Sequence, residues 1–259
     1  PDYAVTGVQT CALPILFLVF GMLGGRSVAC LVPRTAPGLR VEPIDDLTGF
    51  RGAGLARLRF EQVRVSPDSL VGQPGFALSH VAPLGLHYGR LSTACSASGL
   101  AAACLERSTA HAASRRTGDA RIGDKGMVRS LIAAMATDVE AGRLLCRSAC
   151  RAEDERLPQA FEASLMAKYF TSRAAVRAAS DAVQILGAAG CHASSPVSRY
   201  YRDAKIMEII EGTTQIHEDL LGRMFVDRAG EPGGPARPDS QATNPHVSAP
   251  VSRHEYLSR

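Results

Sequence analysis

The stretch from Phe76 to about Val226 carries apolar residues at helical spacing and is broken at only three places. The apolar stripes are Ile132, Met135, Val139 and Cys146, with the small Gly142 between the last two, and then Val176, Ala179, Val183 and Leu186. The breaks fall at residues 117–126, at Pro158 and at residues 187–196. The pattern predicts long helices over 76–116, 126–155 and 159–186 and shorter ones over 197–208 and 213–225. A run of this length indicates a mainly α-helical fold.

The composition of the chain indicates how these helices pack. The chain has 259 residues, no Trp and 5% aromatic residues, so its core must be aliphatic and rich in Ala, which favours closely packed helices. Hydrophobic residues make up 46% and charged residues 21%, as in ordinary globular proteins, which argues against a wholly disordered chain.

A smaller β part precedes the helices, over residues 16–74. Short β-rich runs lie at 16–20, 28–33 and 39–44, separated by Gly and Pro. The run 55–65 alternates apolar and polar residues, with a slip between Phe60 and Val63 that predicts a bulge. Turn residues over 67–75 close this part. From Asp227 to Arg259 the chain is rich in Pro, Gly, Ser and Asn without apolar periodicity, which predicts a disordered tail.

The first fifteen residues are interpreted as an artefactual leader. Residues 5–15 (VTGVQTCALPI), back-translated, match a common sequencing-library adapter read in frame. The chain is then expected to be a gene fragment that lacks its N-terminal portion. The apolar run 12–24 is shorter than the roughly 20 residues that a spanning helix needs and has no basic leader, so we expect neither a membrane helix nor a targeting segment.

Charge and cysteine usage exclude several function classes. Lys and Arg number 29 against 25 Asp and Glu, a net charge of +4, so nucleic-acid binding through a polycationic surface is not expected. The seven Cys show no CxxC pair and no metal-ligand spacing, which indicates reduced thiols, a cytoplasmic protein and no metal site. Cys146 and Cys150 are one helical turn apart, which is more typical of packing than of metal binding.

Site-like residues gather in two short stretches. In the first, Glu211 follows Ile209 and Ile210 and precedes Gly212. Apolar surroundings raise a Glu pKa and suit a general base, whereas the alternative is a carboxylate that stabilises a helix N-terminus. Thr213 or Thr214 can cap the next helix, and Gly212 lets another molecule approach the backbone.

The second stretch, QILGAAGC (184–191), ends a long helix in small residues. Gly187 and Ala188 leave the backbone accessible to a phosphate or ribose, but Gly after a helix is also the ordinary C-cap. The two readings stay open.

Taken in order, these stretches resemble the acyl-CoA dehydrogenase family. The matching segments are VRVSPDSLVG (63–72), SRRTGD (114–119), QILGAAG (184–190) and YYRDAKIMEIIEGTTQIH (200–217). The resemblance covers about 16–226 and implies the remnant of a β-barrel-like middle domain over 16–74, followed over 75–226 by a C-terminal up-down four-helix bundle. The segments 179–191 and 205–217 are also similar to the branch of the family that acts in polyketide and related natural-product pathways.

The resemblance implies an FAD enzyme that introduces an α,β-double bond into an acyl thioester carried by coenzyme A or a carrier protein. Glu211 matches the catalytic base, with the backbone N–H of that Glu polarising the thioester oxygen. Some members place the base just before an Arg on the first bundle helix, but here that pair is Gly89–Arg90, which offers no carboxylate. The resemblance also assigns Arg90 and Gly212 to the substrate.

FAD contacts carry over to three groups of residues. The resemblance implies a first group of Arg115, Arg116 and Thr117, a second group of Gln184, Gly187 and Ala188, and a third group of Thr213 and Gln215. For Arg115 and Arg116 a solvated helix end is the alternative. The chain departs from the family pattern at Gly118–Asp119 in place of Phe-Gly, at Gly126 in place of Gln, at Ala188 in place of the second Gly, and at His87 in place of Asp. Asp119 would repel a pyrophosphate, and His87 is interpreted as a surface or interhelical histidine.

The resemblance further implies electron-transfer flavoprotein or another electron acceptor as partner. It also implies a homodimer or homotetramer formed through helices 126–155 and 159–186. Because the family's N-terminal helical domain and early strand segment have no counterpart here, the fragment alone is expected to be inactive. Two alternatives stay open: a non-catalytic helical oligomerisation scaffold, and a flavin oxidase or hydroxylase on the same fold. The retained Glu211 opposes both.

Overall fold

A computed structural model describes residues 10–11 and 14–230, and most of the leader and of the predicted tail lie outside these ranges. The chain divides into two compact units, residues 1–221 and 222–259, and the fold and site described below lie in the first, except for the last residues of the C-terminal helix.

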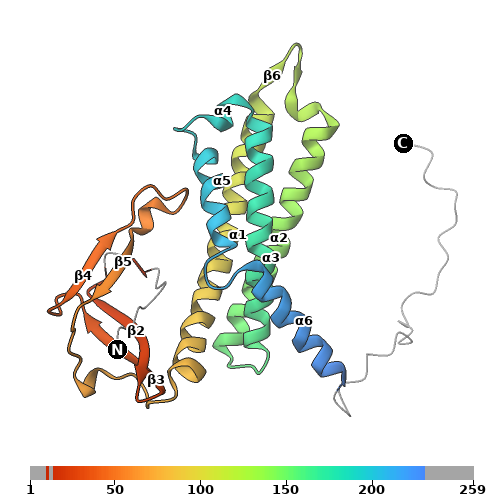
Figure 1. The fold of residues 1–259 in the computed structure, drawn as a ribbon. Helices are drawn as coiled ribbons and strands as arrows, with labels where there is room; N and C mark the ends of the chain where they lie inside the picture. The colour runs from red at the N-terminus through yellow and green to blue at the C-terminus, as the bar shows by residue number, and fades with distance from the viewer. Residues whose placement is uncertain (1–9, 12–13, 231–259) are drawn as a thin grey trace. The chain divides into compact units, whose positions relative to one another are not determined.

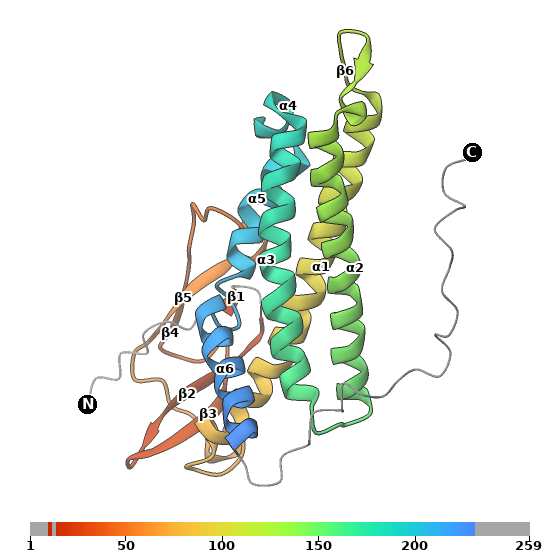
Figure 2. The same cartoon turned by 90° about the vertical axis from the view of Figure 1, so that its right-hand side faces the viewer.

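The helical part is an up-down bundle of four helices, which confirms the predicted fold class. The helices are α1 (Ala82–Ser114), α2 (Gly126–Asp154), α3 (Ala160–Leu186) and the shorter α5 (Pro196–Met207). Successive helices run in opposite directions, and α5 lies against α1 and α3 (Figures 1 and 2). At 33 residues, α1 is about 50 Å long.

Small side chains allow these helices to approach closely. Among the described residues, seven of the thirteen buried members of the larger core cluster are Ala, from α1, α3 and α5. They are Ala97, Ala101, Ala175, Ala178, Ala179, Ala182 and Ala204. Met135 and Val139 of α2 fill the space between them, on the stripe that the sequence predicts.

The β part consists of a hairpin and a three-stranded antiparallel sheet. Strands β2 (Leu16–Leu23) and β3 (Arg26–Pro33) pair around Gly24–Gly25, whose positive φ angles of 55° and 79° suit a tight hairpin turn. The sheet has the order β1 (Thr10–Cys11), β5 (Leu55–Phe60), β4 (Leu39–Pro43). The predicted bulged strand over 55–65 is wrong at its end, because β5 stops at Phe60 and Gln62 takes a φ of 51° in the turn that follows.

The β part is tied to α5 by a backbone-to-side-chain contact. The N–H of Phe50 donates to Oδ1 of Asp203 at 2.7 Å, and a Cβ added to Gly49 would lie 2.4 Å from the carbonyl oxygen of Arg202. Only glycine fits so close to the α5 backbone. This contact positions α5, and therefore the chain segment that leaves its C-terminal end.

Two further helices complete the elements. The short α4 (Ala188–Cys191) follows the α3 terminus, and α6 (Thr214–Gly230) extends past the predicted end at 225 into the first residues of the predicted tail. Within the described residues, no helix combines the length and apolarity needed to cross a membrane.

Candidate active site

Glu211 lies in the short turn between α5 and α6, and its backbone is strained. Its φ is 56°, in the left-handed region that non-glycine residues rarely adopt, and Gly212 follows with a φ of 97°. Such strain persists only where the surroundings enforce it, and it is concentrated at functional sites. The carboxylate is thus not simply a helix N-terminal residue, because α6 begins three positions later at Thr214.

The carboxylate of Glu211 rests directly on the backbone of α1. A Cβ added to Gly89 would lie 2.2 Å from Oε2 and 2.3 Å from Cδ of Glu211. No side chain other than hydrogen can therefore occupy position 89 while Glu211 keeps this orientation. The two positions considered for a base from sequence thus meet at one point in space.

Burial and two cations act on this carboxylate in opposite directions. Burial raises the pKa of Glu211, while the charges of Arg90 and Lys168 lower it. From the sequence, Ile209 and Ile210 are expected to provide the apolar surroundings of the Glu211 carboxylate. In the structure Ile209 is half exposed, and the carboxylate instead contacts α1 at Gly89. A half-buried carboxylate whose pKa is raised is a better proton acceptor than an ordinary surface carboxylate.

Arg90 is almost completely buried beside Glu211. Its guanidinium lies over the ring of Phe161, with Cζ 5.4 Å from the ring centroid, and burial lowers its pKa while Glu211 opposes that shift. Its Nε and Nη1 have no hydrogen-bond partner among the described residues. Buried N–H groups without a hydrogen-bond partner are costly, which makes this position a candidate to meet a ligand.

Unpartnered buried polar atoms gather around this turn. Five buried side-chain nitrogen and oxygen atoms lack a partner within the described part of the chain, and four of them belong to Arg90, Thr214 and His217. Because native proteins pair nearly all such atoms, this concentration marks the turn and the start of α1 as a functional region. The backbone N–H of Glu211 also makes no hydrogen bond to any described residue.

The candidate cofactor residues of the first group lie on an exposed hairpin at one end of the bundle (Figures 1 and 2). Arg115 is the C-cap of α1, and Arg116 and Thr117 form β6 (Arg116–Thr117), which pairs with β7 (Ala120–Arg121). The turn uses Gly118 with a φ of 61°, and the Arg116 guanidinium donates to the carbonyl oxygen of Asp119. Gly118 and Asp119, which stand in place of Phe-Gly, thus lie in a tight exposed turn.

The second group lies at the same end of the bundle. Gln184 is exposed near the end of α3, and Gly187 is its C-cap, with a φ of 59° and no atom within 4 Å of an added Cβ. Ala188 begins α4 and is exposed. Gly187 is thus a C-cap whose backbone is also open to another molecule, so the two readings of the sequence are compatible.

The third group, Thr213 and Gln215, lies at the start of α6. The N–H of Ile216 donates to Oγ1 of Thr213 at 3.5 Å, so Thr213 caps the helix, and both residues line a cavity of about 280 Å³ with Arg173 and Glu208. Lys168, which contacts the Glu211 turn, precedes Gln184 by sixteen residues of α3, about 24 Å along the helix axis. Within one chain, Glu211, Gly212 and Arg90 therefore lie together. The first and second groups of candidate cofactor residues, in contrast, lie far from the third.

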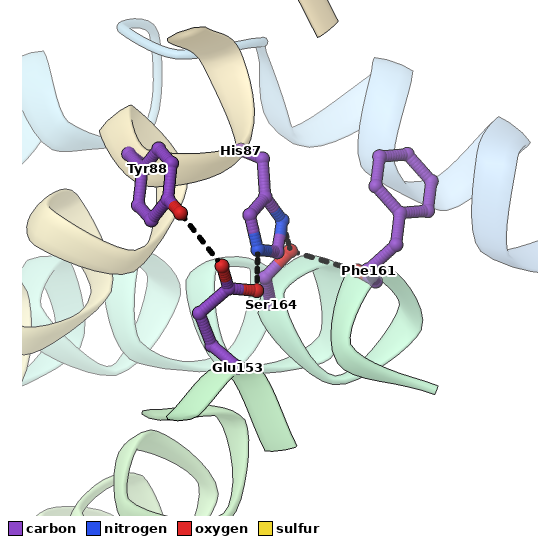
Figure 3. Close-up of polar contacts among 5 residues, drawn as sticks. All are labelled: His87, Tyr88, Glu153, Phe161 and Ser164. Atoms are coloured by element: carbon purple, nitrogen blue, oxygen red, sulfur yellow. Dashed lines mark hydrogen bonds and ion pairs between the residues drawn. The ribbon is translucent and has the colours of Figure 1, made fainter. Parts of the chain in front are cut away.

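His87, which replaces the family's Asp, is a buried interhelical residue. Figure 3 shows its ring pointing from α1 toward Glu153 of α2 and Ser164 of α3, with Nε2 2.7 Å from Oε2 of Glu153 and Nδ1 3.1 Å from Oγ of Ser164. The Tyr88 hydroxyl donates to the other oxygen of Glu153 at 2.8 Å. Although Ser, His and Glu are the residue types of a hydrolytic relay, Ser164 is fully buried and donates to the carbonyl of Phe161, so the network holds helices together.

Glu153→Gln is expected to destabilise the fold in a pH-dependent way. Hydrogen bonds from Tyr88 and then His87 lower the pKa of Glu153 below 4.5, its value in an unfolded chain. A lowered carboxyl pKa stabilises the fold above the unfolded value, and this contribution disappears as pH falls through the folded pKa. We expect the variant to lose about 1–3 kcal/mol at neutral pH, and much less near pH 3, in urea unfolding.

The matched control is Glu155→Gln, which removes a carboxylate from the same helix end. Glu155 pairs with Arg151 at 2.6 Å, but both side chains are largely exposed, so a loss of under about 1 kcal/mol is expected. Equal losses for the two variants would contradict a special role for the His87 network.

Sequence reasoning missed Lys168, His217 and the part that Gly89 plays. Lys168 interrupts the core-facing stripe of α3 formed by Leu165, Ser172 and Ala175. A charged residue on the buried face of a helix is a signal that could have found it. The six Cys whose side chains the structure describes are free, and no described group of three or more His, Cys, Asp or Glu could hold a metal ion.

Residues 79–225 match the family described as acyl-CoA dehydrogenase, C-terminal domain. The short-chain specific mitochondrial acyl-CoA dehydrogenase of Homo sapiens is 37% identical over 193 residues, covering 74% of this chain and 46% of that protein. The structure of FkbI, for biosynthesis of the methoxymalonyl extender unit of the Fk520 polyketide, is similar with a TM-score of 0.77 at 32% identity, covering 85% of this chain and 60% of that one. The glutaryl-coenzyme A dehydrogenase complex with glutaryl-CoA has a TM-score of 0.80 at 31% identity, covering 85% and 56%.

The chain thus spans about half the length of the curated relatives that it matches. Because the family match covers more than half of this chain, and includes α1 to α5 with the Glu211 turn, it settles the family. The chain belongs to the acyl-CoA dehydrogenase family.

Proposed function

We propose that the protein is an FAD-dependent dehydrogenase that introduces an α,β-double bond into an acyl thioester, with Glu211 as the base. The observation that carries this proposal is the Glu211 carboxylate, which is half buried on Gly89 and held in a strained turn between two cations. Membership of the acyl-CoA dehydrogenase family supports the reaction class.

In this proposal Glu211 removes the proton from the α-carbon of the thioester. The raised pKa strengthens the carboxylate as a proton acceptor, and the nearby charges of Arg90 and Lys168 oppose that rise and so favour the ionised form. The free N–H of Glu211 is available to the thioester oxygen, which would stabilise the negative charge that develops there. Gly212 directly follows Glu211, and the charge of Arg90 acts on the Glu211 carboxylate, which agrees with their proposed contact to substrate.

FAD, when bound, supplies an acceptor for the hydride that leaves the β-carbon. The exposed residues at the bundle end fit a diphosphate-bearing group, because they combine Arg115 and Arg116 with the open backbone of Gly187. Thr213 and Gln215 border the cavity near Glu211 and would hold the other part. Since the separation along α3 keeps these groups apart in one chain, we propose that a second copy completes each cofactor site.

The test uses the protein expressed from its complete gene and loaded with FAD. It is mixed anaerobically with butyryl-CoA, and separately with a butyryl group on the phosphopantetheine of a carrier protein. Loss of the flavin absorbance in either mixture is expected, and the faster one identifies the carrier. A flavin that stays oxidised with both, and with longer and branched acyl groups, would contradict the proposal. Electron-transfer flavoprotein is then offered as acceptor to the reduced enzyme, in comparison with oxygen.

Self-association follows from the same proposal. The described residues of α2 and α3 leave large apolar side chains exposed, among them Met127 at 84%, Leu144 at 56% and Phe161 at 39%. We expect a dimer or tetramer in sedimentation velocity, with Leu144→Glu shifting it toward smaller species. A monomer at every concentration would refute this expectation.

A further inference from the structure

Lys168 is a fully buried cation whose backbone contacts the proposed reaction leaves unexplained. Its side chain lies on α3 with none of its surface exposed. Nζ donates to the carbonyl oxygen of Gly212 at 2.6 Å and lies 3.5 Å from the carbonyl oxygen of Glu208. Burying an ammonium group without water is costly unless it is paired, so the position of this lysine needs a reason.

The two carbonyls that Lys168 contacts flank Glu211 in the chain. Glu208 ends α5, and its carbonyl also accepts the N–H of Thr214 at 3.1 Å, whereas Gly212 directly follows the strained residue. One ammonium group therefore spans the whole turn. This contact favours the left-handed backbone of Glu211, which in turn directs its carboxylate onto Gly89.

We propose that Lys168 is a positioning residue for Glu211: its ammonium group fixes the turn from Glu208 to Gly212 and supplies positive charge beside the carboxylate. The inference rests on the proposed function, because it assumes that Glu211 is the base. It extends that function by assigning the orientation and ionisation of the base to a residue on another helix.

The charged groups facing Lys168 come from every neighbouring element. Glu208 and Glu211 lie on the turn, Arg90 on α1, and His217 on α6, with Nδ1 of His217 2.9 Å from the carbonyl of Thr213. Burial lowers the pKa of Lys168 to about 8, against the opposing effect of the two carboxylates, and Arg90 lowers it further. Lys168 is therefore charged at neutral pH and loses its proton in mildly alkaline solution.

Lys168→Met tests the proposal in the FAD-loaded protein from the complete gene. Removing a cation that lowers the pKa of Glu211 raises that pKa, so the acid limb of kcat/KM should move to higher pH. Because a misplaced base loses much of its effect, we also expect kcat to fall by about 10–100-fold while KM changes little. Lys125→Met, which removes the same side chain from the start of α2, is the matched control and should leave all three quantities unchanged.

A purely structural lysine would give a different result. Reduced stability with an unmoved acid limb, or a wild-type kcat in Lys168→Met, would overturn the proposal. If Lys168→Met does not fold, Lys168→Gln keeps a hydrogen-bond donor without the charge and should show the same shift of the acid limb.

Hydrogen exchange of the wild-type protein provides a readout that needs neither variant nor activity. Exchange rates are first corrected for the intrinsic effect of pH on amide exchange. The protection of the backbone amides in the turn 208–214 should then fall between about pH 7 and about pH 9.5, because Lys168 loses its proton in this range. The protection of the amides in α2 should stay unchanged. Constant protection of the turn would overturn the proposal. Full activity in Glu211→Gln would contradict the proposed function itself. An inactive Glu211→Gln together with a Lys168→Met variant that behaves as wild type would contradict only the role of Lys168.

Discussion

Glu211→Gln is expected to slow flavin reduction by the acyl thioester by about 10²–10⁴-fold, the usual contribution of a positioned general base. The substitution keeps the size of the side chain and its place on Gly89 but removes the proton acceptor. The alternative position for a base, residue 89, holds Gly, and the carboxylate of Glu208 on the same turn is paired with Lys205 at 2.6 Å. The measurement is the anaerobic rate of flavin bleaching in a stopped-flow instrument.

Two controls separate chemistry from binding. FAD content should be unchanged in Glu211→Gln, because the proposed contacts of Arg115, Gln184 and Gly187 are untouched. Glu211→Asp should keep partial activity, since it retains a carboxylate withdrawn by one methylene group. Wild-type bleaching in Glu211→Gln would reduce Glu211 to a carboxylate of the turn and remove the main support for the dehydrogenase assignment.

Gly89→Ala is expected to reduce activity by about 10²-fold, the effect of misplacing a catalytic group by roughly 1 Å, with little effect on stability. The added methyl would lie 2.2–2.8 Å from the three carboxyl atoms of Glu211, which is too close for any of them to remain in place. Those atoms end a flexible side chain, so the carboxylate can swing away without disturbing the helices. Ala is also preferred to Gly within a helix by about 1 kcal/mol, which offsets part of the strain.

The controls for Gly89→Ala lie on the same helix. An added Cβ at Gly85 or Gly99 would meet no atom within 4 Å, so Gly85→Ala and Gly99→Ala should keep wild-type activity and gain some stability. Urea unfolding and flavin bleaching are measured for all three variants. Full activity in Gly89→Ala, or equal losses in all three, would contradict the placement of Glu211 on α1.

The spacing of apolar residues predicts the helices well because the residues on the buried face of a helix recur every three or four positions within its own sequence. The stripe through Met135 and Val139 predicts a helix over 126–155, and α2 spans Gly126–Asp154. The run 55–65 is predicted less well, because alternation continues past Phe60 although the chain turns at Gln62. The alternation of apolar and polar residues does not indicate where a residue other than Gly takes a positive φ.

The site depends on contacts that no local pattern records. Gly89 and Glu211 are separated by more than a hundred residues, so a glycine inside α1 looks like a defect until its partner is known. Lys168 contacts Gly212 across 44 residues in the same way. The motif indicates Glu211 and its neighbours, whereas the residues that orient it become visible only when α1, α3 and the turn are placed together.

The Ala-rich interface between α1, α3 and α5 limits how this sequence can change over evolution. Where Ala is already the buried residue, a mutation can remove only one methyl group, whereas almost every other substitution adds volume. Overpacking a tight core costs about 1–3 kcal/mol per site. Single-base transitions in Ala codons give Val or Thr, both larger than Ala, so the commonest mutations at Ala178, Ala179 or Ala182 overpack the interface. Divergence of this bundle should therefore proceed through paired changes on facing helices, in which one residue shrinks before its neighbour grows.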